Sequence, residues 1–331
     1  MEKSFIHYKG QVMETKNYRK MPDSLFKQLR DDYYAKPSMN EVRAEVRDIF
    51  LKGNKTMRKI NDRFFKDLFS KVKLYHCKWT IEDVFEYKPL LETFYNKIFS
   101  NTDVYPPDAP LIKNIETAFR VGGAGVAAKP SNFRLDQTID IIKKYNLNGN
   151  YYDPSCGWGV RLVGSLATGT NYYGTDPNGP LVERLNTVAG LFKEIDLFAP
   201  DTDIRTQGSE IFVPEWVGKM GVVFTSPPYF FLEDYKLGEQ STKLYPDYKD
   251  WLNNFLFKTF QNAYQYLIPG GHILINIKRY AKFDLENDTQ ILLRKAGFHY
   301  AGIETFTNIT RINSKGEKVD NNEGIYVYKK D

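Results

Sequence analysis

Two consecutive prolines follow directly on a short apolar run in this chain. The run is Gly221–Phe224, and it continues into Thr225-Ser226-Pro227-Pro228-Tyr229-Phe230. Proline has no amide hydrogen and fixes φ at about −65°, so a strand cannot continue through both prolines. The pattern predicts a buried strand that ends near residue 225 and passes into a stiff loop, at the carboxyl edge where open α/β sheets bind their ligands.

The same loop carries groups that suit a flat molecule with an exocyclic amino group. The Ser226 hydroxyl and the Pro227 carbonyl can each accept one amino hydrogen, which frees the nitrogen lone pair for methylation. The Tyr229 ring can stack on the planar molecule. We therefore predict a catalytic set made of Ser226, Pro227, Pro228 and Tyr229. A proline-rich strand exit with a surface tyrosine would have the same letters, so a second motif is needed to decide.

That second motif lies upstream, where residues 151–162 predict a strand, a glycine turn and the start of a helix. Nucleotide-like cofactors use this arrangement, because Gly157 and Gly159 allow the backbone to approach a ligand closely. Asp176 ends the next predicted strand, 19 residues after Gly157, and is spaced to accept hydrogen bonds from ribose hydroxyls. The combination favours a cofactor site over an ordinary glycine turn.

Together, these motifs resemble the amino-directed DNA methyltransferases that use S-adenosylmethionine. Residues 153–159 resemble their cofactor motif, residues 226–229 their catalytic motif, and residues 129–133 the segment that closes over the methionine end of the cofactor. The resemblance runs from about Lys129 to the C-terminus. It implies an α/β fold, with a Rossmann-like mixed seven-stranded sheet of the class I methyltransferase type and helices on both faces.

The resemblance also implies which residues bind S-adenosylmethionine. Where the family has an aspartate for the adenine amino group, this chain has Ser209 followed by Glu210, and either side chain can face that group. The cofactor-binding residues expected from the resemblance are Lys129, Pro130, Ser131, Asn132, Phe133, Asp153, Ser155, Gly157, Gly159, Asp176, Pro177, Ser209 and Ser226.

The form of the catalytic motif bears on the substrate. Serine at its first position, preceded by Thr225, is common in cytosine-N4 enzymes, whereas adenine-N6 enzymes more often carry Asp or Asn there. The resemblance therefore implies a DNA methyltransferase of the restriction-modification kind, which flips cytosine out of duplex DNA into the loop. Three alternatives stay open: an adenine-N6 DNA methyltransferase, an RNA or protein amino methyltransferase, and an inactive nucleic-acid-binding relative.

Positive charge is concentrated in the first third of the chain. Residues 1–120 carry 23 Lys and Arg against 17 Asp and Glu, whereas the remainder carries 23 against 24. The cations are densest between residues 52 and 78 and alternate with apolar residues at helical spacing. Because cations of this kind bind phosphates, we predict a nucleic-acid-binding set of Lys55, Arg58, Lys59, Arg63 and, at the target base, Phe230. A solvated helix face that binds nothing would show the same pattern.

Proline spacing and capping signals suggest the domain organisation. Three prolines between residues 104 and 110 mark a linker, so we predict a mainly helical, basic domain over 1–115 and a methyltransferase domain over 116–331. Capping boxes start helices at Ser38 and Thr80. Farther on, Pro269-Gly270-Gly271 predicts a turn into a strand over 272–277, and a last strand over 324–328 is expected to pair antiparallel with residues 303–309.

Other features limit what else the chain contains. The two cysteines and four histidines form no disulfide or metal-ligand pattern, so we expect no metal site. No long apolar run appears, and we expect a cytoplasmic protein with no membrane contact. The loop over 231–245 is too short to recognise a DNA sequence, so recognition is expected from the N-terminal domain or from a partner, as a homodimer or with a separate specificity protein.

Overall fold

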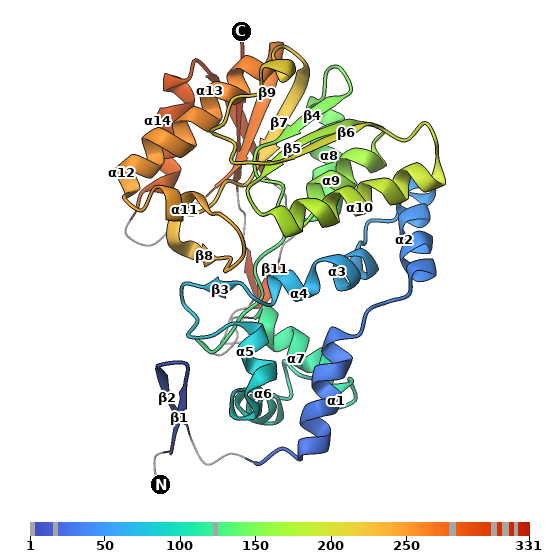
Figure 1. Cartoon of the computed structure of the whole chain (residues 1–331), viewed down its shortest axis with the longest axis vertical. Helices are drawn as coiled ribbons and strands as arrows, with labels where there is room; N and C mark the ends of the chain where they lie inside the picture. The colour runs from blue at the N-terminus through green and yellow to red at the C-terminus, as the bar shows by residue number, and fades with distance from the viewer. Residues whose placement is uncertain are drawn as a thin grey trace.

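A seven-stranded mixed sheet forms the centre of the second part of the chain (Figure 1). The computed structural model describes residues 4–15, 19–121, 125–277, 283–305, 310–312, 318–320 and 324–331. Neighbouring strands follow the order β10-β13-β9-β7-β4-β5-β6, and β13 runs antiparallel to both β9 and β10. The strands are β4 (Asn150–Asp153), β5 (Asn171–Asp176), β6 (Thr202–Thr206), β7 (Met220–Thr225), β9 (Leu267–Asn276), β10 (His299–Thr305) and β13 (Gly324–Lys329).

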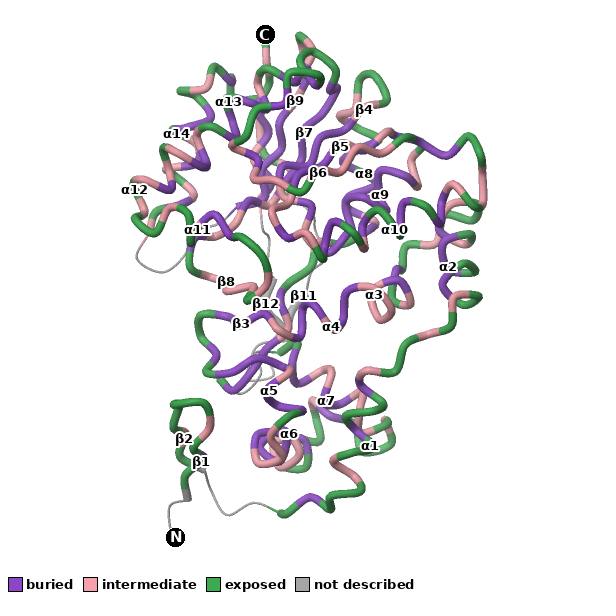
Figure 2. The backbone as a smooth tube through the Cα atoms, viewed as in Figure 1, coloured by how far each residue is buried: buried purple, intermediate pink, exposed green. Residues whose placement is uncertain are grey.

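Side chains that alternate along the strands build two separate hydrophobic cores on the two faces of the sheet. Tyr151 and Val222 point into one core, whereas the adjacent Tyr152 and Val223 point into the other. The buried strands lie between the helix layers in Figure 2. The first face is covered by α8 (Leu135–Tyr145), α9 (Val160–Ala167) and α10 (Gly179–Ile195), and the second by α12 (Tyr248–Trp251), η4 (Leu252–Leu256), α13 (Phe257–Tyr266) and α14 (Leu285–Lys295). The predicted mixed sheet with helices on both faces is confirmed.

The segment before the sheet is mainly helical, as predicted. Ser38 and Thr80 each close a capping box, and Gly53 ends a helix in the left-handed conformation at φ 68°. The elements are β1 (Ser4–Tyr8), β2 (Gln11–Thr15), α1 (Asp23–Tyr34), α2 (Met39–Lys52), α3 (Arg58–Phe64), α4 (Lys66–Phe69), β3 (Lys73–Leu74), α5 (Ile81–Glu86), α6 (Lys88–Ser100) and α7 (Leu111–Arg120).

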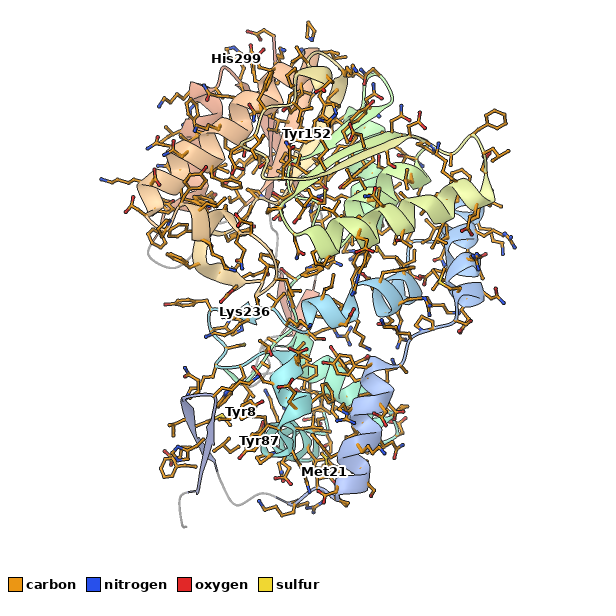
Figure 3. All side chains as sticks on the ribbon, viewed as in Figure 1. Tyr8, Met21, Tyr87, Tyr152, Lys236 and His299 are labelled. Carbon is orange, nitrogen blue, oxygen red and sulfur yellow. The ribbon has the colours of Figure 1, made fainter. Side chains whose placement is uncertain are left out.

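Hydrophobic packing divides the chain differently from the predicted boundary near residue 115. Buried residues of α1 and α5–α7 share one core with Val126 and Ala127, and Tyr8 of the first hairpin stacks on Tyr87 at 4.6 Å (Figure 3). Residues of α2–α4, in contrast, join the core under α8–α10. The middle of the predicted N-terminal domain therefore packs with the helices that cover the seven-stranded sheet.

Two ends of the fold differ in detail from the expectation. Strand β9 begins at Leu267 and contains the predicted turn as an irregularity. Gly270 has a φ of 78°, and Leu267 and His272, five positions apart, pair with Met220 and Val222, two positions apart. Gly270 and Gly271 also exchange backbone hydrogen bonds with Lys330. The predicted antiparallel pairing of the last strand is confirmed for residues 303–305 and extends back to His299, while 306–309 lie outside the described residues. Short elements complete the structure: η2 (Pro214–Trp216), η3 (Phe230–Leu232), β8 (Glu233–Asp234), α11 (Ser241–Leu244), β11 (Thr310–Ile312) and β12 (Lys318–Asp320).

Candidate functional site

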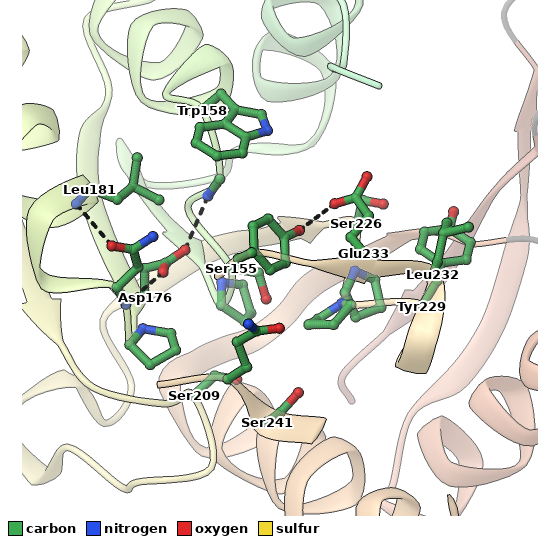
Figure 4. A pocket seen from close by; sticks show the side chains of 18 of the residues that line it. Ser155, Trp158, Asp176, Leu181, Ser209, Ser226, Tyr229, Leu232, Glu233 and Ser241 are labelled. Atoms are coloured by element: carbon green, nitrogen blue, oxygen red, sulfur yellow. Dashed lines mark hydrogen bonds between the residues drawn. The ribbon is translucent and has the colours of Figure 1, made fainter. Parts of the chain in front are cut away.

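A cavity of about 330 Å³ opens where β4, β5, β6 and β7 end (Figure 4). The loops that follow these four strands supply much of its wall, as expected for an open α/β sheet. The structure thus brings together motifs that are far apart in the sequence. The predicted residues in the wall are Ser131, Asn132, Phe133, Ser155, Gly157, Asp176, Pro177, Ser209, Ser226, Pro227, Pro228, Tyr229 and Phe230.

Asp176 is the last residue of β5 and lies in the cavity wall. The backbone N–H of Gly157 donates to its Oδ2 at 3.3 Å, and the N–H of Asn178 donates to its Oδ1 at 3.0 Å. Burial nevertheless raises the pKa of Asp176 to about 6. A carboxylate accepts about four hydrogen bonds, so capacity remains for hydroxyl groups of a ligand.

The two glycines of the turn have different environments. Both have positive φ, 55° at Gly157 and 76° at Gly159, a region that glycine occupies without strain. Only Gly157 of this pair lines the cavity. A Cβ on Gly159 would lie 3.0 Å from Leu185 and 3.1 Å from Phe65. Gly159 therefore serves the packing at the start of α9, and not the approach of a ligand as predicted.

Asp153 also lies outside the cavity, although the resemblance placed it among the cofactor-binding residues. It is fully buried, and its Oδ2 accepts hydrogen bonds from Arg161 Nε and from the Tyr172 hydroxyl, each at 2.9 Å. Arg161 also donates to the Ser155 carbonyl and reaches the cavity wall. Asp153 therefore acts here by holding Arg161 and the glycine turn.

Hydrogen-bond partners distinguish the two candidates for the contact with the adenine amino group, Ser209 and Glu210. The Ser209 hydroxyl is buried against the Thr259 hydroxyl at 2.7 Å, and the Ser209 carbonyl accepts from Asn262. Glu210 also lines the cavity, and its buried Oε2 has no hydrogen-bond partner among the described residues. Burial raises the pKa of Glu210. The available acceptor at this position is thus the Glu210 carboxylate.

The Ser-Pro-Pro-Tyr loop leaves β7 as predicted. Ser226 and Tyr229 are half-buried in the cavity wall, and Pro227 is buried. The Tyr229 hydroxyl donates to the Asn276 carbonyl at 3.4 Å, a long contact that joins the loop to the end of β9. Ser226 and the Tyr229 ring therefore line one cavity with Asp176, which is the arrangement that the two motifs predicted.

Phe230 differs from its predicted role as a nucleic-acid contact. It has a positive φ of 53° and its side chain is 3% exposed. Its ring packs on Tyr248, Trp251 and Phe283, because the left-handed backbone turns it back into the core. Phe230 thus forms part of the base of the cavity and is not an exposed stacking surface.

The segment over 129–133 is divided between two cavities. Ser131, Asn132 and Phe133 reach the cavity described above, whereas Pro130 is buried and lines neither cavity. Lys129 lines a second cavity instead, where its Nζ lies 4.4 Å from the centre of the Phe69 ring. The predicted contact of Lys129 and Pro130 with the cofactor is therefore not provided by the main cavity.

Several residues in the wall were not in the predicted site. Glu233 and Tyr235 lie two positions apart in the loop after the catalytic motif, and the Tyr235 hydroxyl donates to Glu233 at 2.5 Å. Burial raises the pKa of Glu233. Asn178 is buried with its Nδ2 lacking a partner among the described residues. Residues two positions apart in an extended segment lie on one face. The spacing of Glu233 and Tyr235 was therefore the sequence signal that could have placed both side chains in the cavity wall.

A short ladder fixes the loop that carries Glu233. Strand β8 pairs with β3 of the N-terminal segment, through Leu74 opposite Glu233, and the Tyr75 N–H donates to the Leu232 carbonyl at 2.9 Å. The Tyr235 ring lies 6.0 Å from the ring of Trp158 in the glycine turn. The N-terminal segment therefore positions part of the cavity wall.

Acidic residues pair with two of the four predicted nucleic-acid-binding cations, Arg58 and Lys59. Arg58 lies 3.6 Å from Asp62 and 3.9 Å from Glu116, and Lys59 lies 3.5 Å from Glu41. Arg63 donates to the Pro37 carbonyl at 2.8 Å. Lys55 is exposed and has no ion pair within the described part of the chain. Acids from outside this stretch thus neutralise part of its positive charge in the fold.

Within the described residues, no group of three or more His, Cys, Asp and Glu side chains is placed to hold a metal ion. None of the helices described is long and apolar enough to cross a membrane. Cys77 and Cys156 are free and buried, and burial raises the pKa of both thiols, which disfavours the thiolate needed for a nucleophile.

No family model and no curated protein sequence matches the chain. Solved structures similar to it include an S-adenosylmethionine-dependent methyltransferase from Methanosarcina mazei, with 14% identity, 57% of this chain and 96% of that chain covered and a TM-score of 0.38. An O-methyltransferase from Thermotoga maritima has 10% identity, 61% and 67% coverage and a TM-score of 0.40. A 1,6-didemethyltoxoflavin-N1-methyltransferase from Burkholderia thailandensis, solved with S-adenosylhomocysteine, has 11% identity, with 59% of this chain and 77% of that chain covered and a TM-score of 0.39.

The topology of the sheet identifies the fold. The strand order, with β13 inserted antiparallel between β9 and β10, is the mixed seven-stranded sheet expected from the resemblance. The chain therefore has the class I methyltransferase fold.

Proposed function

We propose that this protein transfers a methyl group from S-adenosylmethionine to the exocyclic amino group of a base in DNA, with cytosine N4 as the target. One observation carries the proposal: Asp176 and the loop from Ser226 to Tyr229 line a single cavity at the carboxyl edge of the sheet. A methyl donor bound at Asp176 and an amine bound at the loop from Ser226 to Tyr229 would meet in that cavity.

The residues of the wall fit the proposed cofactor. Asp176 is oriented by two backbone donors and would accept hydrogen bonds from the ribose hydroxyls. Glu210, whose buried Oε2 has no partner among the described residues, would accept from the adenine amino group, with Pro177 against the ring. S-adenosylmethionine, when bound, supplies an electrophilic methyl group.

The chain's own groups would prepare the amine. Ser226 Oγ and the Pro227 carbonyl oxygen would each accept one amino hydrogen, so that the nitrogen lone pair turns toward the methyl group. Preorganised acceptors of this kind act best in a site that excludes water. Tyr229 would hold the base by stacking, and the Glu233 carboxylate is available to take up the proton that the amine loses.

A methyl-transfer assay tests the proposal directly. The protein is incubated with tritiated S-adenosylmethionine and, in parallel, with duplex DNA, RNA and protein, and labelled DNA is digested to nucleosides for chromatography. We expect label in DNA as N4-methylcytosine and none with the Asp176→Ala variant. Label in N6-methyladenine would change the base, and label in RNA or protein alone would replace the substrate class. Cofactor binding without any transfer would identify an inactive relative.

The ionisation of Asp176 should make cofactor binding depend on pH. Its pKa is about 6, and only the carboxylate can accept from both ribose hydroxyls. The ionised fraction of a group with this pKa falls about tenfold between pH 7 and pH 5. We therefore expect the affinity for S-adenosylmethionine, measured by calorimetry, to fall about tenfold over this range.

The matched control for this pH effect is Asp176→Asn. This variant should bind weakly and with the same affinity at pH 5 and pH 7. An affinity of the unchanged protein that does not vary with pH would contradict the assigned role of Asp176.

A further inference from the structure

A second cavity of about 330 Å³ adjoins the main one. The two share Asn132, Phe133 and Arg134 in their walls. The second cavity brings together Lys55, from the loop before α3, and Lys129, from the segment before α8. These two lysines are 74 positions apart in the sequence and were predicted to bind different partners.

The charges around this cavity are not balanced. Its acid, Asp136, is already bound by Arg134, through Nε at 3.0 Å and Nη2 at 2.5 Å. Neither Lys55 nor Lys129 forms an ion pair with any described residue. The cavity therefore holds two ammonium groups that form no ion pair among the described residues, with Asp136 acting on Lys55, and Asp62 and Glu116 on Lys129, only at longer range.

Lys129 is the more unusual of the two lysines. It is half-buried, its Nζ contacts the Phe69 ring, and burial lowers its pKa. The nearby Lys66, which is buried as well, is paired with Glu116 at 2.8 Å and Asp62 at 3.6 Å. Lysine is rarely buried without such a partner, because desolvation of an unpaired ammonium costs free energy. A bound anion would supply the missing partner.

An amide completes the wall. Asn61 lines the same cavity, and its Oδ1 has no hydrogen-bond partner within the described residues. The two ends of an asparagine amide are assigned from their partners, so this group can accept from a sugar hydroxyl or, with its ends exchanged, donate to a phosphate oxygen.

We propose that the second cavity, with Lys55, Lys129 and Arg134 in its wall, binds a phosphate group of the nucleic acid strand that carries the target base. The inference rests on the proposed function. A flipped base stays attached to its sugar and phosphates, so a base stacked on Tyr229 brings the phosphates of its own strand close to the adjoining cavity. The carboxylate of the cofactor's methionine has similar chemistry, and the experiment separates the two sources.

The test measures binding of a fluorescein-labelled duplex DNA oligonucleotide of mixed sequence at several salt concentrations. Lys129→Gln and Lys55→Gln should each weaken binding at low salt by about tenfold and reduce the slope of log K against log salt by roughly 0.9. Lys129→Arg should restore most of the affinity. The matched control is Lys52→Gln, because Lys52 is exposed in the same basic stretch but is paired with Asp48 at 2.8 Å, and it should bind as the unchanged protein does.

Calorimetry with S-adenosylmethionine on the same variants distinguishes the sources of the anion. Unchanged cofactor affinity, together with the loss of oligonucleotide binding, supports the phosphate site. Weaker cofactor binding without an effect on the oligonucleotide would overturn it in favour of the methionine carboxylate. If Lys129→Gln binds the oligonucleotide like Lys52→Gln while the unchanged protein methylates DNA, the phosphate site is wrong and the proposed function stands. If the unchanged protein binds no oligonucleotide, the phosphate site is also wrong, whatever the transfer assay shows.

Discussion

Arg161→Met is expected to lower the free energy of unfolding by about 3–5 kcal/mol, the cost of leaving one member of a buried ion pair without its partner. The Arg161 side chain is 9% exposed and that of Asp153 is 0% exposed. Removal of the guanidinium would leave the Asp153 carboxylate with the Tyr172 hydroxyl and the Ser155 N–H as donors. Urea unfolding followed by circular dichroism measures the effect.

The matched control for Arg161→Met is the double variant with Asp153→Asn, which removes the buried charge together with its partner. It should recover most of the lost stability, because replacing both members of a buried pair is much milder than breaking it. A double variant that is as unstable as Arg161→Met would show that Arg161 acts through packing alone.

The pH dependence of Arg161→Met gives a second check. Burial raises the pKa of Asp153, and Arg161 opposes that rise, so the variant should have a higher pKa at Asp153 than the unchanged protein. A carboxyl group whose pKa is higher in the folded state than in the unfolded state stabilises the fold while it is protonated. The free energy of unfolding therefore falls as the pH rises through the pKa of the folded state. The stability deficit should therefore be larger at pH 8 than at pH 5, and an equal deficit would contradict the electrostatic explanation.

Features set by short stretches of backbone were predictable from the sequence. Pro227 and Pro228 end β7 because neither can continue a ladder, and Gly157 occurs where the chain needs a positive φ of 55°. Successive apolar residues of β7 and β9 point into opposite cores, because side chains alternate between the two faces of a strand. These features depend on neighbours within a few residues, so the sequence contains the information directly.

Roles that depend on distant partners were not predictable in the same way. Asp153 has the position of a cofactor residue, but its environment is decided by Arg161 and Tyr172. Phe230 follows a catalytic motif, but its positive φ turns it into an aromatic core. The acids that pair with the basic stretch come from α2 and α7, so a count of charges along the sequence overstates the charge of that surface.

Tyr229→Ala is expected to reduce kcat/KM for the nucleic acid substrate by about 5- to 150-fold, because a stack between a base and an aromatic ring contributes roughly 1–3 kcal/mol. Tyr229 is half-buried in the cavity wall, in the loop that follows β7, whereas Asp176 ends β5, and β4 lies between these two strands in the sheet. The affinity for S-adenosylmethionine should therefore stay unchanged. Steady-state transfer of tritiated methyl groups, with calorimetry of the cofactor, measures both quantities.

Tyr229→Phe is the matched control for this loss, since it keeps the ring and removes the hydroxyl. The hydroxyl contact with the Asn276 carbonyl is long, at 3.4 Å, so the phenylalanine variant should keep most of the activity. If Tyr229→Phe loses as much as Tyr229→Ala, the hydroxyl and its link to β9 position the loop, and stacking is not the role of the residue. If both variants keep full activity, the base is held elsewhere. Because Ser226 and Pro227 line the cavity from the same loop as Tyr229, their proposed role as acceptors for the amine would then be wrong as well.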